Sequence, residues 1–194
     1  MTHVTILTGV PASGGTTVTK HAIEKLEAEG ERFKMVTYSD IMLEEALLRN
    51  WVAVRDDMRK MDPTRQKELQ IIAAKKIAEI KTASIIVDTH ATIRTTKGYL
   101  PGLPIWVLDK LKPEMIIVVE ASEEQILRRR SADKSRMRDV QDVAGVREHQ
   151  EVNRATCMAY AFYTGAPVKI LQNKDGKLLD AVEEFLNALR QTTS

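Results

Sequence analysis

A glycine-rich stretch near the start of the chain constrains the fold more than any other feature. An apolar run leads into Gly9-Val10-Pro11-Ala12-Ser13-Gly14-Gly15-Thr16-Thr17, and a helical pattern follows. The stretch matches the phosphate-loop template G-x-x-x-x-G-K-[ST] except at the lysine, which is Gly15. An ordinary strand-to-helix turn would use similar residues, but the position directly after an N-terminal strand favours phosphate binding. We therefore predict that Gly9 to Thr17 surround a phosphate with backbone N–H groups, and that Thr16 offers its hydroxyl to Mg²⁺.

Composition limits the class of protein. The 194 residues suffice for one compact domain, and 43% hydrophobic against 29% charged residues is ordinary globular composition. A net charge of +2 argues against a nucleic-acid binder, and no apolar run approaches the roughly 18 residues of a membrane span. The single cysteine, Cys157, excludes an internal disulfide and fits a reducing compartment. We expect a cytoplasmic protein with neither nucleic-acid nor membrane partners.

Short apolar runs alternate with helical patterns along the whole chain. We expect strands at residues 4–8, 33–38, 84–87, 115–119 and 168–171, and helices at 17–29, 40–50, 66–81, 105–111, 123–131, 143–163 and 178–189. Strands with little alternation are buried on both faces, so the pattern predicts an α/β fold with a five-stranded parallel sheet flanked by helices. Residues 99–104 read as a rigid Pro/Gly loop. On helix 143–163 we expect Val152, Ala155, Ala159 and Phe162 to face the core, and Arg147, Gln150 and Arg154 to share a polar face.

Ligands of such sheets bind at the carboxyl ends of the strands, so the residues after each strand are the candidates for the site. Asp88 ends the third strand in the position of a Walker B acid, which holds magnesium or its water shell. A helix or turn cap is the alternative for Asp88, and likewise for Ser39 and Asp40 after the second strand. His90 and Arg94 follow the third strand, and Asn173 follows the fifth.

The strongest concentration of charge is Leu127–Asp139, where six cations and two acids fall within thirteen residues. Guanidinium groups bind phosphate oxygens in fork geometry and neutralise charge during phosphoryl transfer. We predict this role for Arg129, Arg136 and Arg138, and a solvated helix face for Arg130 and Lys134. Arg138 is the first candidate to replace the charge of the absent lysine.

Several motifs together resemble the archaeal-type adenylate kinases, in order and almost from end to end. They are the loop Gly9–Thr17, Met58-Arg59-Lys60-Met61-Asp62-Pro63, Val87-Asp88-Thr89-His90, Lys97-Gly98-Tyr99-Leu100-Pro101-Gly102-Leu103-Pro104, Arg136–Asp139, and Glu148-His149-Gln150 with Asn153-Arg154. The Gly-Tyr-Leu-Pro-Gly-Leu-Pro run is the most specific of them. The chain departs from the loop motif at Gly15, and the resemblance implies that methanogen-like members lack the lysine as well.

The resemblance implies a nucleoside monophosphate kinase fold that transfers a phosphoryl group reversibly between ATP and AMP, with Mg²⁺. It implies one domain with a mobile AMP-side segment at about 39–62 and a short lid at about 131–142, and a trimer as in some relatives. Asn173 would border the adenine of ATP. The residues expected on the AMP side are Ser39, Arg55, Arg59, His90 and Arg94; Arg55, Arg59 and Arg94 are the candidates for the AMP phosphate.

Three other functions are consistent with the same loop. A kinase for another small acceptor would differ only around residues 39–62 and 88–94. A nucleotide-binding regulator without turnover would keep phosphate affinity but would have no use for the arginine-rich segment. A GTPase-like switch should carry Asn-Lys-x-Asp after a late strand, and Gln172-Asn173-Lys174-Asp175 lacks the one-residue gap.

Overall fold

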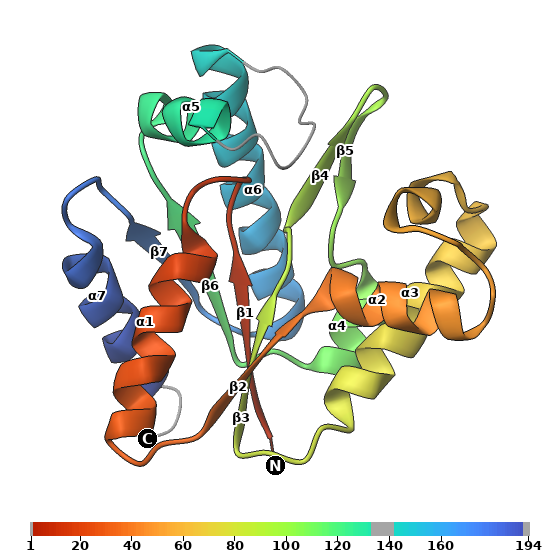
Figure 1. The fold of residues 1–194 in the computed structure, drawn as a ribbon, viewed down its shortest axis with the longest axis horizontal. Helices are drawn as coiled ribbons and strands as arrows, with labels where there is room; N and C mark the ends of the chain where they lie inside the picture. Colours follow the sequence, from red (N-terminus) through yellow and green to blue (C-terminus); the bar gives the residue numbers. More distant parts are fainter. Residues whose placement is uncertain (1, 133–141, 192–194) are drawn as a thin grey trace.

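A parallel β-sheet forms the centre of the computed structural model, which describes residues 2–132 and 142–191, with the side chain of Arg59 excepted. Its strands are β1 (His3–Thr8), β2 (Phe33–Thr37), β3 (Ser84–Asp88), β6 (Met115–Glu120) and β7 (Val168–Gln172). They pair in parallel in the order β2-β3-β1-β6-β7 (Figure 1). This is the five-stranded parallel sheet predicted from the sequence.

Helices cover both faces of this sheet (Figure 1). They are α1 (Gly15–Ala28), α2 (Tyr38–Leu48), α3 (Pro63–Ala78), α4 (Ile105–Leu111), α5 (Glu123–Ala132), α6 (Val143–Thr164) and α7 (Leu178–Arg190), with a 3₁₀ helix η1 (Arg55–Lys60). One apolar cluster joins α1 and α7 to the sheet around Phe185, and another joins α3, α4 and α6 to its other face around Ile6. Every residue of β6 is buried, as the uninterrupted apolar run indicated. No helix in the described part of the chain is long and apolar enough to cross a membrane.

The start of α3 is set by a side-chain cap and a proline. The Asp62 carboxylate accepts from the backbone N–H groups of Thr64 and Arg65 at 3.1 and 3.0 Å. Pro63 occupies the first helical position, where a missing N–H costs nothing. A carboxylate cap followed by proline therefore begins this helix, three residues before the apolar periodicity becomes visible.

The predicted loop at residues 99–104 was wrong in part, because its first residues form a strand. The strands β4 (Thr92–Thr95) and β5 (Gly98–Pro101) pair as an antiparallel hairpin. The Thr95 hydroxyl donates to the carbonyl of Gly98 at 2.8 Å, and Gly98 adopts a φ of 116°, which closes the tight turn. At the base of the hairpin the Gly102 N–H donates to the carbonyl of Ala91 at 2.7 Å.

The predicted core face of α6 was also wrong. Ala155, Ala159 and Phe162 are exposed, and the Phe162 side chain is 96% exposed. The buried face instead carries the polar residues His149, Gln150 and Asn153, followed by Cys157 and Tyr160. His149 Nε2 and Asn153 Oδ1 hydrogen-bond to Thr92 of β4, whereas His149 Nδ1 and Gln150 Oε1 have no hydrogen-bond partner among the described residues. The inward face of this helix is therefore polar, and the rule that apolar residues face inward does not apply here.

A small separate core lies beside the main one, in the part of the chain predicted as the AMP-side segment. It joins Ala46 of α2, Met58 of η1 and Leu69 of α3, with Trp51 and Met61 packed against it. Sequence patterns left residues 55–62 unassigned, because η1 is short and highly charged. These three elements form a unit at one side of the sheet (Figure 1).

Candidate active site

The loop between β1 and α1 packs tightly against the sheet. A Cβ at Gly9 would lie 2.4 Å from the carbonyl oxygen of Val119, so only glycine fits at this position. Ala12 and Gly14 adopt positive φ values of 75° and 92°. Gly14 caps α1 without any side-chain hydrogen bond, which leaves the first backbone N–H groups of the helix available to an anion. The backbone has the form that the phosphate-loop prediction requires.

Gly15 stands where the template has lysine, and its surroundings do not demand a glycine. A Cβ there would lie 3.6 Å from Leu7 Cδ1 and from Val119 Cβ, which is ordinary van der Waals contact. Gly15 is the first residue of α1, and no positive φ is recorded for it. The absence of a cation at this position therefore has no steric cause near the backbone.

Two oxygen ligands suited to Mg²⁺ meet beside the loop. The Thr16 hydroxyl donates to Asp88 Oδ2 at 3.0 Å. Burial raises the pKa of Asp88, and the hydrogen bond from Thr16 partly offsets this effect. Among the described residues no group of three or more His, Cys, Asp or Glu side chains could hold a metal alone. A hydroxyl and one carboxylate fit an ion that receives its other ligands from phosphates and water.

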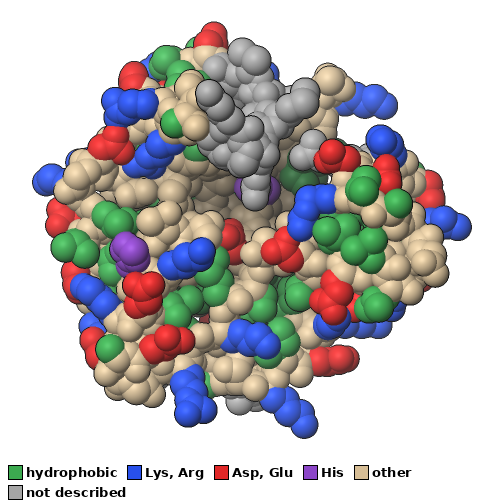
Figure 2. Space-filling model, in the orientation of Figure 1, with side chains coloured by type: hydrophobic (Ala, Val, Ile, Leu, Met, Phe, Trp, Pro, Cys, Tyr) green, Lys and Arg blue, Asp and Glu red, His purple; other side chains and the backbone are tan. Residues whose placement is uncertain are grey.

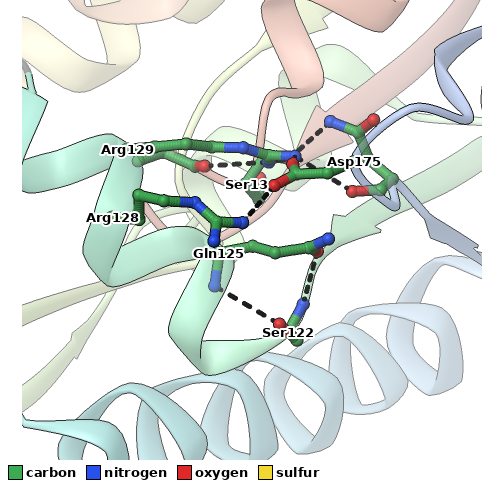
Figure 3. A network of polar contacts seen from close by, with 8 residues as sticks. Ser13, Ser122, Gln125, Arg128, Arg129 and Asp175 are labelled. Carbon is green, nitrogen blue, oxygen red and sulfur yellow. Dashed lines mark hydrogen bonds and ion pairs between the residues drawn. The ribbon is translucent and has the colours of Figure 1, made fainter.

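Arg129 and Arg130 of α5 both donate to backbone carbonyls of the phosphate loop, and Figure 3 shows Arg129 beside Ser13. Arg129 donates to the carbonyls of Ala12 and Ser13 at 3.3 and 2.9 Å. Arg130 Nε donates to the carbonyl of Pro11 at 3.0 Å, so the prediction of a solvated face for Arg130 was wrong. The error arose because helical spacing alone does not show that a loop distant in sequence packs beside α5.

Asn173 also holds the loop. Its buried amide Nδ2 donates to the carbonyl of Ser13 at 2.8 Å, and it would lie 2.2 Å from a Cβ at Gly14. The Asn173 N–H donates to the carbonyl of Glu120 at 2.7 Å. The residue predicted to border a base is thus adjacent to the loop, and one of the two hydrogens of its side-chain amide is donated to the loop backbone.

At the β2 end of the sheet, residues that follow β2 contact the 3₁₀ helix η1. Arg55 donates to the Ser39 hydroxyl at 3.1 Å and to Asp40 Oδ1 at 2.5 Å. Neither Ser39 nor Asp40 caps α2, whose N-cap is Thr37 without a side-chain bond, so their reading as caps was wrong. The side chain of Arg59, also predicted here, is not described. The surface is hollowed near the centre of the view in Figure 2.

His90 and Arg94 flank a polar cluster that sequence reasoning did not single out. His149 is 4% exposed, and its Nε2 lies 3.1 Å from the Thr92 hydroxyl, which donates to Asn153 Oδ1. The Tyr99 ring packs on the His149 ring with centroids 5.1 Å apart. The Glu-His-Gln triplet was visible as a motif, but only the hairpin shows what the histidine contacts.

Other arginines have structural partners. Arg154 donates to both carboxylate oxygens of buried Glu120 at 2.6 and 2.5 Å, and Arg147 donates to Glu123 at 3.0 Å. Gln150, expected on the same polar face, is buried. Arg136 and Arg138, the leading candidates for charge neutralisation, lie outside the described residues, as does most of the predicted lid.

Comparison with known proteins identifies the family. A family model described as an AAA domain matches residues 8–147. An adenylate kinase from Methanococcus aeolicus is 49% identical over 95% of this chain and 96% of its own length. One from Methanocaldococcus jannaschii is 47% identical over 96% of this chain and 98% of its own. The chain belongs to the adenylate kinase family.

Solved structures similar to this family member support the fold. Shikimate kinase from Acinetobacter baumannii, in complex with shikimate, gives a TM-score of 0.63 at 13% identity, over 98% of this chain and 94% of that one. Shikimate kinase from Bacteroides thetaiotaomicron gives 0.59 at 14% identity, over 97% and 98%. Identities this low establish the shared fold alone, so the acceptor must be inferred from the adenylate kinase relatives and the site.

The buried histidine of the cluster predicts a pH dependence of stability. Burial lowers the pKa of His149 from 6.5 to about 4, assisted by the nearby cations Arg130 and Arg94 and by His90. The unfolded chain then binds a proton that the folded chain does not, so the free energy of unfolding rises with pH between these values. The stabilisation should be fully present above pH 6.5 and lost as pH falls towards 4.

His149→Gln removes this titration while keeping a side chain that can hydrogen-bond to Thr92. Between pH 7.5 and 4.5, urea unfolding should show the wild type losing about 2 kcal/mol more than the variant. Equal losses in the two proteins would contradict the assignment of the buried neutral form.

Proposed function

We propose that the protein catalyses reversible phosphoryl transfer from MgATP to AMP, giving two ADP. The observation that carries this proposal is the 46–49% identity, over 95–98% of the chain, to proteins named adenylate kinase. Two features of the site support it. The loop Gly9–Thr17 leads into a helix whose first N–H groups have no side-chain cap, and the Thr16–Asp88 pair lies beside it; both are suited to a metal-bound polyphosphate.

In the proposed reaction the phosphate of AMP is itself the attacking group. It is already charged at neutral pH, so no strong general base is required, and catalysis rests on alignment and neutralisation of charge. The loop would hold the donor phosphates, and Thr16 with Asp88 would hold the ion. Bound there, Mg²⁺ would neutralise charge on the donor phosphates. Ser39, Arg55, Arg59, His90 and Arg94 would receive AMP.

Acceptor choice is the direct test of this function. ADP formation from ATP should be measured with AMP, CMP, UMP and GMP in turn, with and without magnesium. We expect the largest kcat/KM with AMP and no turnover without the metal. A larger kcat/KM with CMP or UMP would favour a kinase for another acceptor, and nucleotide binding without any turnover would favour a regulator.

We further propose that Arg136 and Arg138, with Arg129 on the outer side of the loop, supply the charge that Gly15 does not. Removing a charge-stabilising group typically costs on the order of 10² to 10³ in turnover. Arg138→Ala should therefore lower kcat far more than it raises KM for AMP. Gly15→Lys should fold, since a Cβ fits at this position, but should give no comparable gain in kcat. Near-normal kcat in both Arg136→Ala and Arg138→Ala, with a gain of about tenfold in Gly15→Lys, would contradict the proposal.

Closure around the substrates and assembly of subunits are also proposals. In-line transfer requires exclusion of water, so residues 39–62 and 131–142 should close on the ligands. A mimic of two adenosines joined through five phosphates should slow hydrogen exchange in both segments. Unchanged exchange in both segments would contradict closure.

Exposed Met158 and Phe162 on α6 support self-association, and the proposal of a trimer follows from the resemblance. Light scattering should give the mass of three chains, and the mass of one chain would contradict the trimer. A cytoplasmic location is supported only by the single cysteine.

A further inference from the structure

Arg129 is the centre of a hydrogen-bonded cluster that links three separate segments (Figure 3). It extends from α5 to the carbonyls of Ala12 and Ser13 in the phosphate loop. It also donates to the carbonyl of Asn173 at 3.2 Å and to Asp175 Oδ1 at 2.6 Å, both in the loop after β7. We call this set of contacts the loop brace.

The brace uses the hydrogen-bonding capacity of the guanidinium almost completely. Each terminal nitrogen carries two hydrogens. One nitrogen serves the two phosphate-loop carbonyls, and the other serves Asn173 and Asp175. Because the guanidinium is planar, the contacts on one nitrogen fix the orientation of the other. Asp175 is the only ionised acceptor among these four, and charge-assisted hydrogen bonds are the stronger kind.

The ion pairs of Asp175 contribute little to the free energy of unfolding. Its side chain is 42% exposed, and exposed ion pairs contribute little to the free energy of unfolding. A second arginine, Arg128, pairs with the other carboxylate oxygen, and its side chain is 67% exposed. The two arginines hold the pKa of Asp175 below its usual value. The carboxylate is therefore ionised at neutral pH and tied to α5 from both sides.

We propose that Asp175 is a positioning residue of the donor site, which acts by orienting Arg129 against the phosphate loop. The inference rests on the proposed function in so far as the loop binds the phosphates of ATP. Asp175 binds Arg129, and Arg129 donates to the carbonyls of residues 12 and 13. The position of the Asp175 carboxylate therefore affects the loop through the orientation of the Arg129 guanidinium. Those carbonyls belong to peptide groups that shape the anion-binding loop.

This role predicts effects on the donor and none on the acceptor. Without the carboxylate, one hydrogen of Arg129 loses its acceptor and the guanidinium can turn away from the loop. Asp175→Ala should then raise KM for ATP about three- to tenfold and leave KM for AMP unchanged. Amides of residues 9–16 should exchange faster in the unliganded variant, because Arg129 holds the loop less firmly. Asp175→Glu, which keeps the charge, should recover part of the lost ATP affinity.

Matched variants separate positioning from charge. Arg128→Ala removes an arginine from the same carboxylate and should keep the wild-type KM for ATP. Asp180→Ala removes an exposed acid that faces Lys177 at 3.9 Å, and it should behave like the wild type. If Asp175 acts through Arg129, the double variant Arg129→Ala/Asp175→Ala should have the same KM for ATP as Arg129→Ala alone.

The outcomes distinguish this proposal from the proposed function. A lower KM for ATP in Asp175→Ala would mean that the carboxylate acts only as a repelling charge near the phosphates, and would overturn the inference. Unchanged loop exchange with an unchanged KM for ATP would also overturn it. Absence of ADP formation by the wild type would instead contradict the function, and the exchange of residues 9–16 would still test the brace in the unliganded protein.

Discussion

The contact between Gly9 and the backbone of Val119 is the constraint on which the site depends. Because a Cβ at Gly9 would lie 2.4 Å from the Val119 carbonyl, the chain can leave β1 directly against β6 and turn at once into α1. That turn directs the uncapped start of α1 to the edge where Asp88 ends the neighbouring strand β3. The phosphate loop and the Thr16–Asp88 pair therefore lie at one edge of the sheet, because the residue that follows the middle strand β1 has no side chain.

The parts predictable from sequence were those determined by neighbours along the chain. Five short, mostly apolar runs predicted the five parallel strands, and the apolar periodicity of residues 66–81 predicted most of α3. Asp88 could be placed beside Thr16 because parallel strands present their carboxyl ends at the same edge. Local spacing and one general rule of topology were sufficient for this half of the site.

The parts that were missed depend on contacts between distant segments. Arg130 looked like any exposed helical arginine until α5 was seen beside Pro11. Sequence analysis gave His149 and Asn153 no contacts, because nothing in the sequence shows that Thr92 would meet both side chains. Each hydrogen bond of a buried polar network depends on one specific pair of residues, so hydrophobic periodicity cannot predict it.

The separate core of α2, η1 and α3 has a consequence for how such a protein can change. Met58, Leu69 and their neighbours form a cluster of their own, which joins the main core through α3 and through Met42. No residue of the phosphate loop belongs to this cluster. Substitutions far apart with no shared partners act almost independently on stability. Residues around Met58 and Trp51 can therefore accumulate changes with little effect on the phosphate loop, so this part of the molecule can diverge while the loop keeps its shape.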